Sequence, residues 1–371
     1  MYLKIQTKPE LLELIDVIEN SSISWLAFDT EFFRETTYYP VLSLIQIATA
    51  SQVWVIDALM CDDLTPLKSI LENPKIKKIF HAGDQDWGIL KQYTGAKTWP
   101  YFDTQFMAAF AKLGHSSSLE TLVLELLNEQ VNKSCQKTDW IKRPLTDEQL
   151  AYAAKDAEFV ASIYPILTNK INDLQRMVWV EEEMQSLFHK YEHASFSKDW
   201  LKLCVTGCKW PIHFYAFELA KWREDWAKKL DLPRRHVLTD IALEQVLQKN
   251  SVDHIEDCDC LSEVHADLKI VWQNLQENPV ITGDRRAQLE QMVNDHHQVF
   301  SKEHRQLIKD WQLHIKVIAG ALEIPAFLLV NKQLLQQLAR GDNTSITGWR
   351  LEYLNKVDLW KNLAQSENKD G

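Results

Sequence analysis

The first half of the chain alternates short apolar runs with amphipathic stretches. The β-forming apolar runs are Trp25–Phe28, Leu42–Thr49, Gln52–Asp57 and Lys77–His81. Only Ala50 and Ser51 separate the second run from the third, which favours a hairpin. Stretches with apolar residues at helical spacing lie at Asp84–Tyr93, Thr104–Lys112 and Ser118–Leu127. This alternation predicts an α/β layer fold with a mixed sheet flanked by helices.

From about Met177 onwards the pattern becomes almost purely helical. His213–Leu230 and Arg285–Val299 carry apolar residues three and four positions apart with charged residues between them, as amphipathic helices do. We therefore predict three domains: an α/β domain over residues 1–190, a helical domain over 208–290 and a second helical domain over 291–371.

Composition and charge narrow the class of protein. The chain has 371 residues, of which 46% are hydrophobic and 25% charged, so a soluble protein of two or three domains is expected. It has no apolar run long enough for a membrane span and no secretory leader at its N-terminus. Its six scattered cysteines are typical of reduced thiols, and together these features predict a cytoplasmic protein.

The charge and the motifs bear on three kinds of ligand: nucleic acid, a nucleotide cofactor and structural zinc. The net charge of −11 weighs mildly against nucleic-acid binding, although binding depends on a local basic face rather than on net charge. No phosphate-binding glycine loop is present, so no nucleotide cofactor is expected. The cysteine pairs lack the spacing of a structural zinc site.

The first candidate for chemistry is the pair Asp29 and Glu31, directly after the apolar run WLAF. Residues two apart on a strand share one face, so both carboxylates project to the same side. Two half-buried carboxylates repel each other unless a cation lies between them, and hard divalent cations such as Mg²⁺ prefer oxygen ligands. Because such a pair is common, a polar strand end turning into a loop remains the alternative.

The second candidate is the segment His81–Asp86, which follows a strand and opens a helix. Asp84 is expected to be the N-cap of that helix. Asp86 then falls in the first helical turn, over the carboxyl end of the sheet, where sites in α/β proteins usually form.

The third candidate is the pair Tyr152 and Asp156. Helical residues four apart share a face, so the phenol and the carboxylate look into the same space. A tyrosine hydroxyl near a metal-bound water can orient that water. A surface tyrosine beside a solvated aspartate is the alternative.

Taken in order, the three motifs D-x-E, H-A-G-x-x-D and Y-x-x-x-D resemble those of the tyrosine branch of the DEDD exonuclease superfamily. The stretches FDTEFFRETTYYPVLSLIQIA, KKIFHAGDQDWGIL and KSCQKTDWIKRPLTDEQLAYAAKDAE resemble the ribonuclease D family. Phe217–Val246 is similar to the helical HRDC module, and Gly348–Leu354 to the end of a second such module. The resemblance implies a ribonuclease H-like exonuclease domain followed by HRDC-like helical domains.

The resemblance also implies the roles of the site residues. Asp29, Glu31 and Asp156 would hold one divalent cation, Mg²⁺ or Mn²⁺, and Asp29 with Asp86 a second. Tyr152 would orient the attacking water. The expected products are nucleoside 5′-monophosphates that a monomer releases from the 3′ end of RNA, with tRNA precursors as the expected substrates.

Substrate contacts are expected near these motifs. Phe32 can stack on a terminal base, and Lys133, Lys137, Lys142 and Arg143 can contact phosphates. His81 can touch substrate or serve only as a structural histidine. A basic cluster of Lys228, Lys229, Arg234 and Arg235 offers a further RNA surface. Core packing is the alternative for Phe32, and a solvated face is the alternative for the four basic residues near the third motif.

Two other functions stay open from the sequence. A DNA 3′–5′ exonuclease of the proofreading or Werner-like type would use the same acids, since they cut both kinds of backbone. A non-catalytic RNA-binding module is the second alternative, and the presence of all four acids and Tyr152 weighs against it.

Overall fold

The computed structural model describes residues 1–114, 117–136, 138–193, 198–204, 210–255, 262–277, 283–297, 302–338, 346 and 348–354. Contacts divide them into two units. The first unit contains the sheet, helices α1 to α7 and the C-terminal helices α13 to α16. The second contains the segment Arg34–Val41 and helices α8 to α12.

The first unit is built on a six-stranded mixed sheet with the order β1-β4-β3-β2-β5-β6. β1 runs parallel to β4, β2 to β5 and β5 to β6, whereas β3 and β4 are antiparallel. The strands are β1 (Tyr2–Ile5), β2 (Trp25–Phe33), β3 (Val41–Ala48), β4 (Val53–Asp57), β5 (Lys77–Phe80) and β6 (Tyr101–Asp103). The predicted hairpin and the mixed sheet are confirmed.

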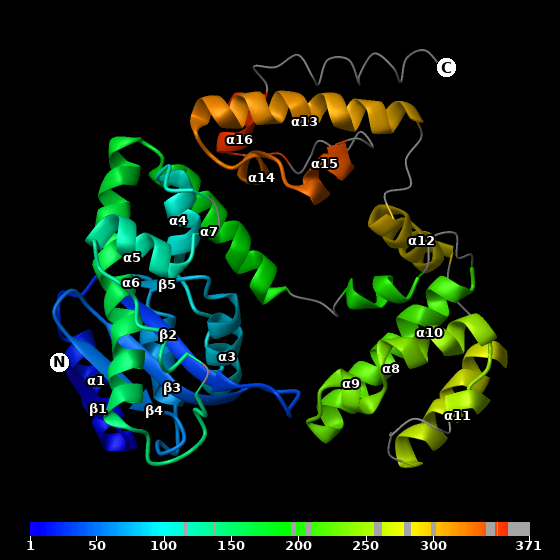
Figure 1. Ribbon diagram of the computed structural model, residues 1–371, viewed down its shortest axis with the longest axis horizontal. Helices are drawn as coiled ribbons and strands as arrows, with labels where there is room; N and C mark the ends of the chain where they lie inside the picture. Colours follow the sequence, from blue (N-terminus) through cyan, green and yellow to red (C-terminus); the bar gives the residue numbers. More distant parts are fainter. Residues whose placement is uncertain are drawn as a thin grey trace. The chain divides into compact units, whose positions relative to one another are not determined.

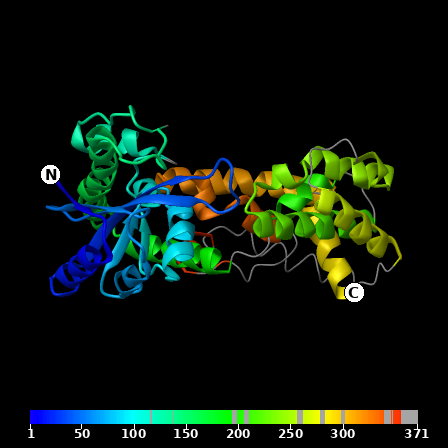
Figure 2. The same ribbon diagram turned by 90° about the horizontal axis from the view of Figure 1, so that it is seen from below.

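Helices cover both faces of this sheet (Figures 1 and 2). The long helix α6 crosses one face and packs on β2, β4 and β5, while α1 lies on the other side. The helices of this part are α1 (Lys8–Glu19), α2 (Lys68–Leu71), α3 (Asp84–Thr94), α4 (Thr104–Phe110), α5 (Leu119–Leu127), α6 (Asp147–Asp173) and α7 (Met177–Glu192). Because both faces are covered, β3 and β4 consist of almost continuous buried residues.

Strand β2 is longer than the sequence suggested. It continues from Trp25 to Phe33, so Asp29 and Glu31 lie within the strand and not at its end. The prediction stopped at Phe28 because charged residues usually mark the end of a buried strand. Here the strand continues because the two carboxylates lie in the site that α6 and α3 help to form.

Local capping explains where the helices of the site begin. Thr146 forms a capping box with Gln149 at the start of α6, which satisfies amides that have no partner within the helix. The prediction that Asp84 caps α3 is wrong: Gly83 is the N-cap residue, and Asp84 and Asp86 both lie in the first turn. Their charges suit the positive end of the helix dipole.

The C-terminal helices of the first unit pack against α7 and its neighbours. Arg176 donates to the carbonyl oxygen of Leu322, the rings of Trp179 and Trp349 stack at 4.7 Å, and Arg350 pairs with Glu183. These helices are α13 (Lys302–Leu322), α14 (Ala326–Leu329), α15 (Lys332–Leu338) and α16 (Trp349–Leu354). A separate second HRDC-like domain over 291–371 stays a prediction.

The second unit is helical around an aromatic-rich core that contains Trp200, Trp222 and Trp226. Its helices are α8 (Ile212–Leu230), α9 (Arg234–Val237), α10 (Asp240–Lys249), α11 (Ser262–Glu277) and α12 (Gly283–His297). Helix α12 runs through position 290, where the sequence suggested a boundary.

Within this unit the Tyr38 hydroxyl donates to Glu224, and burial and that carboxylate raise the pKa of Tyr38 to about 12.

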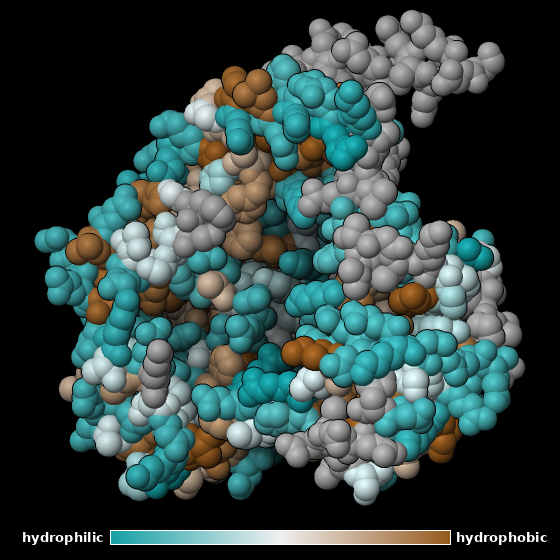
Figure 3. Space-filling view, turned by 45° about the vertical axis from the view of Figure 1, so that its right-hand side comes forward, coloured by the Kyte–Doolittle hydropathy of each residue, from teal (hydrophilic) through white to brown (hydrophobic). Residues whose placement is uncertain are grey.

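In the part of the chain that the structure describes, no helix is long and apolar enough to cross a membrane. Figure 3 shows one face of the molecule, on which hydrophilic residues predominate and apolar residues are scattered.

One buried polar side chain gives a test of the core. Gln46 of β3 is fully buried, and among the described residues its amide has no hydrogen-bond partner. A buried amide without a partner costs about 1–3 kcal/mol. We therefore predict that Gln46→Met raises the free energy of unfolding by on the order of 1 kcal/mol, measured by urea denaturation. A clear loss of stability would show that the amide is bonded, for example by ordered water.

Candidate active site

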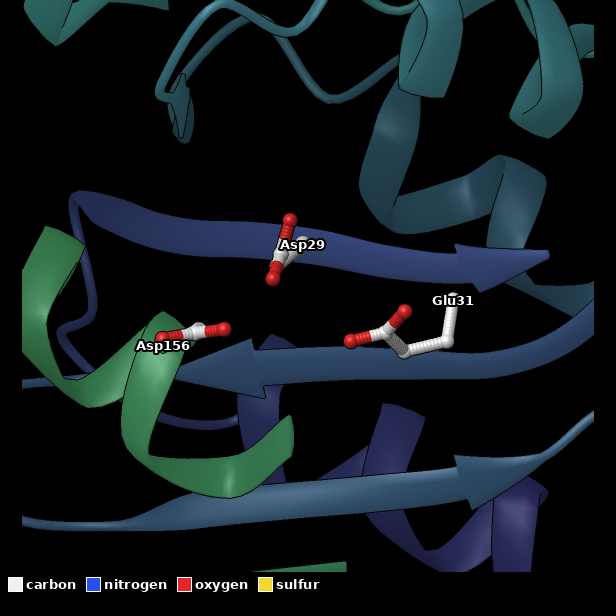
Figure 4. Close-up of side chains that lie close together, drawn as sticks. All are labelled: Asp29, Glu31 and Asp156. Atoms are coloured by element: carbon white, nitrogen blue, oxygen red, sulfur yellow. The ribbon is translucent and has the colours of Figure 1, made fainter. Parts of the chain in front are cut away.

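The site is built where helix α6 crosses strand β2. Asp29 and Glu31 project from β2, and Asp156 projects from α6. One carboxylate oxygen from each of the three lies within 4.8 Å of the others. Figure 4 shows the three carboxyl groups converging between the strand and the helix. The structure thus brings together three of the four acids that the sequence singled out.

Asp86, the fourth acid, lies beside this group on the first turn of α3. Its Oδ1 accepts a hydrogen bond from the hydroxyl of Thr30, the residue between Asp29 and Glu31. Its charge contributes to the raised pKa values of both Asp29 and Glu31. Asp86 is therefore within electrostatic reach of the trio without being a member of it.

A tight turn places Asp86 over the sheet. A side chain at Gly83 would clash with Phe80, because a Cβ there would lie 2.4 Å from the Cβ of Phe80. The amides of Ala82 and Gly83 both donate to the carboxylate of Asp103, at 3.1 Å each. Asp103 also accepts from Gln105 at 2.8 Å and from the Tyr101 hydroxyl at 2.9 Å. This buried acid was not predicted, and its position at the end of a short strand before a helix was the available signal.

Burial raises the pKa of all three clustered acids, and the charges of neighbouring acids add to the rise for Asp29 and Glu31. Burial, followed by the charges of its acidic neighbours, raises the pKa of Asp29 well above its usual range. The same causes raise the pKa of Glu31 to about 9. Burial raises the pKa of Asp156 to about 6, and a hydrogen bond from Tyr152 opposes that rise. Ionisation of these carboxyl groups is unfavourable without a counter-charge. Such a set of oxygen ligands suits a hard divalent cation, which would neutralise their charge.

Tyr152 lies one helical turn before Asp156, as predicted. Its hydroxyl is hydrogen-bonded to the Asp156 carboxylate, and burial together with that carboxylate raises the pKa of Tyr152. The phenol therefore stays protonated at neutral pH and acts as a hydrogen-bond donor. A cavity of about 190 Å³ adjoins this pair and is also lined by Asn132, Lys155 and Phe159.

His81 has structural contacts. Its Nδ1 lies 3.0 Å from the Thr104 hydroxyl, which in turn donates to the carbonyl oxygen of Phe80 at 3.0 Å. Burial lowers the pKa of His81, so the ring is neutral at physiological pH. These contacts join β5 to α4 and favour the structural interpretation over a substrate contact.

Arg143 is also held within the protein. Its guanidinium forms two hydrogen bonds of 2.9 and 2.7 Å with the buried carboxylate of Asp57 and donates to the carbonyl oxygen of Trp140 at 2.7 Å. These partners favour a structural role over the phosphate contact that the sequence suggested, because the donors are already engaged. No sequence pattern indicated that Asp57, at the end of β4, would be its partner.

The remaining predicted substrate contacts lie at the surface. Lys133 is exposed and pairs with Glu120 at 2.5 Å, which leaves it accessible because exposed pairs are weak. Lys142 is exposed and Phe32 is half-buried next to Glu31, whereas Lys137 lies outside the described residues. Contact of Phe32 or Lys133 with substrate stays a prediction.

The basic cluster of the second unit is engaged in local ion pairs. Arg234 pairs with Glu224 and Asp199, Lys229 with Glu263 at 3.2 Å, and Lys228 with Glu224 at 3.7 Å. Arg235 donates to the carbonyl oxygen of Glu35 at 3.3 Å. An RNA surface at this cluster stays a prediction.

Comparison with known proteins agrees with this geometry. Residues 2–172 match a family of 3′–5′ exonuclease domains. The chain is 30% identical to ribonuclease D of Zymomonas mobilis over 347 residues, which covers 91% of this chain and 88% of the relative. It is also 30% identical to ribonuclease D of Desulfotalea psychrophila, over 94% of this chain and 96% of the relative.

A crystal structure of Escherichia coli RNase D has the same fold, with a TM-score of 0.80, 24% identity and 99% of each chain covered. The fold and the acidic site thus define a 3′–5′ exonuclease. More specifically, the chain belongs to the ribonuclease D family.

The repulsion within the site predicts a pH-dependent stability. Without a cation, the folded chain holds protons that the unfolded chain releases, from the ordinary glutamate pKa of 4.5 up to about 9 for Glu31. The stability contributed by these protons is complete below pH 4.5 and is lost as the pH rises through the folded pKa values. We predict that Asp29→Asn melts higher than wild type at pH 8 in EDTA, by roughly 2–4 °C for about 1 kcal/mol.

Thermal unfolding at pH 4.5 and pH 8, with EDTA or with Mg²⁺, tests this prediction. The two proteins should melt together at pH 4.5, and Mg²⁺ should stabilise wild type more than the variant. Equal melting temperatures at pH 8 in EDTA would contradict the idea that carboxylate repulsion destabilises the cation-free site.

Proposed function

We propose that this chain removes nucleoside 5′-monophosphates one at a time from the 3′ ends of structured RNA, with tRNA precursors as its substrates. The observation that carries the proposal is the convergence of Asp29, Glu31 and Asp156 next to the Tyr152 hydroxyl. The relatives' name, ribonuclease D, supports the choice of RNA. We further propose that the chain acts as a monomer in the cytoplasm.

The metal requirement follows from the donor set. We expect Asp29, Glu31 and Asp156 to hold one divalent cation, and Asp29 with Asp86 to hold a second, with Mg²⁺ or Mn²⁺ as the ions. Divalent cations at such a site supply a water of lowered pKa and stabilise the charge on the leaving 3′-oxygen. These four carboxylates come from three elements, β2, α6 and α3.

Tyr152 has a separate task. Because its phenol stays protonated and points to Asp156, it cannot take a proton from the attacking water at neutral pH. It can hold that water by a hydrogen bond and orient a lone pair toward the terminal phosphodiester. Loss of the hydroxyl is therefore expected to lower kcat more than it raises KM.

Cleavage of a 5′-labelled single-stranded RNA with Mg²⁺, Mn²⁺ or EDTA tests the proposed activity. We predict a ladder that shortens from the 3′ end and is absent in EDTA. Asp29→Asn should lower the rate by at least roughly 10³-fold, since metal-assisted catalysis contributes several kcal/mol. Asp84→Asn is the matched control, because Asp84 is an exposed acid two positions from Asp86, and it should keep the rate within about threefold.

The outcomes separate the alternatives. Cleavage of a matched DNA oligonucleotide at an equal rate would favour the DNA exonuclease. Tight RNA binding by folded wild type without cleavage in either metal would leave the non-catalytic RNA-binding module.

A further inference from the structure

A network of hydrogen bonds fixes the segment that leads into α6. Arg143 lies near its end, and its side chain is 20% exposed, whereas that of Asp57 is 1% exposed. Nε and Nη2 of the guanidinium bond the two carboxylate oxygens of Asp57 at 2.9 and 2.7 Å. Such a two-point ion pair fixes direction as well as distance. The end of β4 thereby holds a segment that lies about 90 residues away in sequence.

The same guanidinium holds the backbone of Trp140. Nη1 donates to the Trp140 carbonyl oxygen at 2.7 Å, and Nη2 donates to the Ser43 hydroxyl at 3.1 Å. The Ser43 hydroxyl itself donates to the Trp140 carbonyl at 2.5 Å. One carbonyl thus receives two donors, one from the strand β3 and one from Arg143. The position of Trp140 is therefore fixed from the sheet.

The Trp140 side chain lies against Tyr152. The indole is buried, at 4% exposed, and its ring centroid is 6.1 Å from that of the phenol with an interplanar angle of 35°. Tyr152 also borders the cavity shared with Asp156. The phenol ring thus has a packed neighbour in Trp140 and open space beside it, so the indole limits how far the ring can turn.

We propose that Trp140, held by the Arg143–Asp57 ion pair, is a positioning residue that fixes the Tyr152 hydroxyl for catalysis. The inference rests on the proposed function, in which Tyr152 orients the attacking water. It adds a chain of contacts from the sheet to that hydroxyl: Asp57 holds Arg143, Arg143 holds Trp140, and Trp140 limits the motion of the phenol. None of these three residues needs to touch the substrate.

A second aromatic pair on α6 offers a matched comparison. Trp25 packs on Tyr164 at 5.1 Å between ring centroids, and Tyr164 lies on the same helix but outside the acidic site. If Trp140 served only to stabilise α6, then Trp140→Leu and Trp25→Leu would act alike. If Trp140 acts through Tyr152, only Trp140→Leu should depend on the Tyr152 hydroxyl.

The test is a double-mutant cycle on kcat, measured in the steady state over a range of RNA concentrations at saturating Mg²⁺. We expect Trp140→Leu to lower kcat roughly 10-fold with KM within about threefold, as part of the roughly 10²-fold that correct placement of a reacting group can supply. In a Tyr152→Phe background the same change should cost less than about threefold, because coupled residues are not additive. Trp140→Phe, which keeps an aromatic ring, should restore most of the rate.

Each other outcome overturns the inference. Unchanged kcat in Trp140→Leu, or a full 10-fold loss in the Tyr152→Phe background as well, would show that Trp140 does not act through Tyr152. Trp25→Leu should lower the stability of the protein, and its effect on kcat should be the same with and without the Tyr152 hydroxyl. If Trp25→Leu were coupled to Tyr152→Phe as strongly as Trp140→Leu, the coupling would reflect a general effect on α6. Wild-type kcat in Tyr152→Phe alone would end both the inference and the role of Tyr152, while Asp29→Asn still reports whether the metal-dependent activity itself holds.

Arg143→Lys supplies an independent arm. Lysine keeps the charge but loses the two-point bond to Asp57 and the donor to Trp140, so a similar loss of kcat that again disappears with Tyr152→Phe is expected. If Mg²⁺ raises the melting temperature of Arg143→Lys as much as that of wild type, the arrangement of the carboxylates is unchanged in the variant. If Arg143→Lys does not fold, the Trp140 variants alone decide the inference.

Discussion

The repulsion among three half-buried carboxylates is the constraint on which the rest of the site depends. Asp29, Glu31 and Asp156 place their oxygens within 4.8 Å of one another, which no isolated chain would do without protons or a cation. The folded protein holds them there because two rigid elements cross. Strand β2 is hydrogen-bonded within a sheet, and α6 packs across it. The packing of the hydrophobic core thus offsets the repulsion among the carboxylates, and a bound cation would relieve that repulsion.

The loops next to the site are held by buried acids that do not belong to it. Asp103 receives the amides of the turn before α3, and Asp57 receives Arg143 from the segment before α6. Both acids lie at the ends of strands, where a carboxylate is close to the segments that leave the sheet. Each of these two acids accepts several hydrogen bonds, whereas the acids of the site accept fewer and carry raised pKa values. Buried aspartates thus hold loops where several donors surround them, and acidic residues with few donors form the candidate cation site.

The acids, Tyr152 and the α/β class could be predicted because they depend on local pattern. The strand period places Asp29 and Glu31 on one face of a strand, and the helix period places Tyr152 and Asp156 on one face of a helix. The order of the three motifs indicated the family. The length of β2 could not be predicted, since the carboxylates that interrupt its apolar pattern are tolerated only because α6 and α3 lie over them. The internal partners of Arg143 and His81 could not be predicted either, because Asp57 and Thr104 are distant from them in sequence. Long-range pairing of polar groups carries no periodicity, so sequence pattern cannot reveal it.

The hydrogen bond from Thr30 to Asp86 shows how the fourth acid can join the site while remaining fixed. A carboxylate has two oxygens and about four lone-pair positions. The Thr30 hydroxyl occupies one position on Oδ1, which leaves Oδ2 outside that bond. Because Thr30 lies between Asp29 and Glu31 on β2, the strand that supplies two of the acids also orients the fourth acid, Asp86 of α3. A shift of β2 would therefore move Asp29, Glu31 and Asp86 together, and only Asp156 and Tyr152, on α6, would be displaced relative to them. The packing of α6 on β2 next to these residues therefore sets the distance between the two groups.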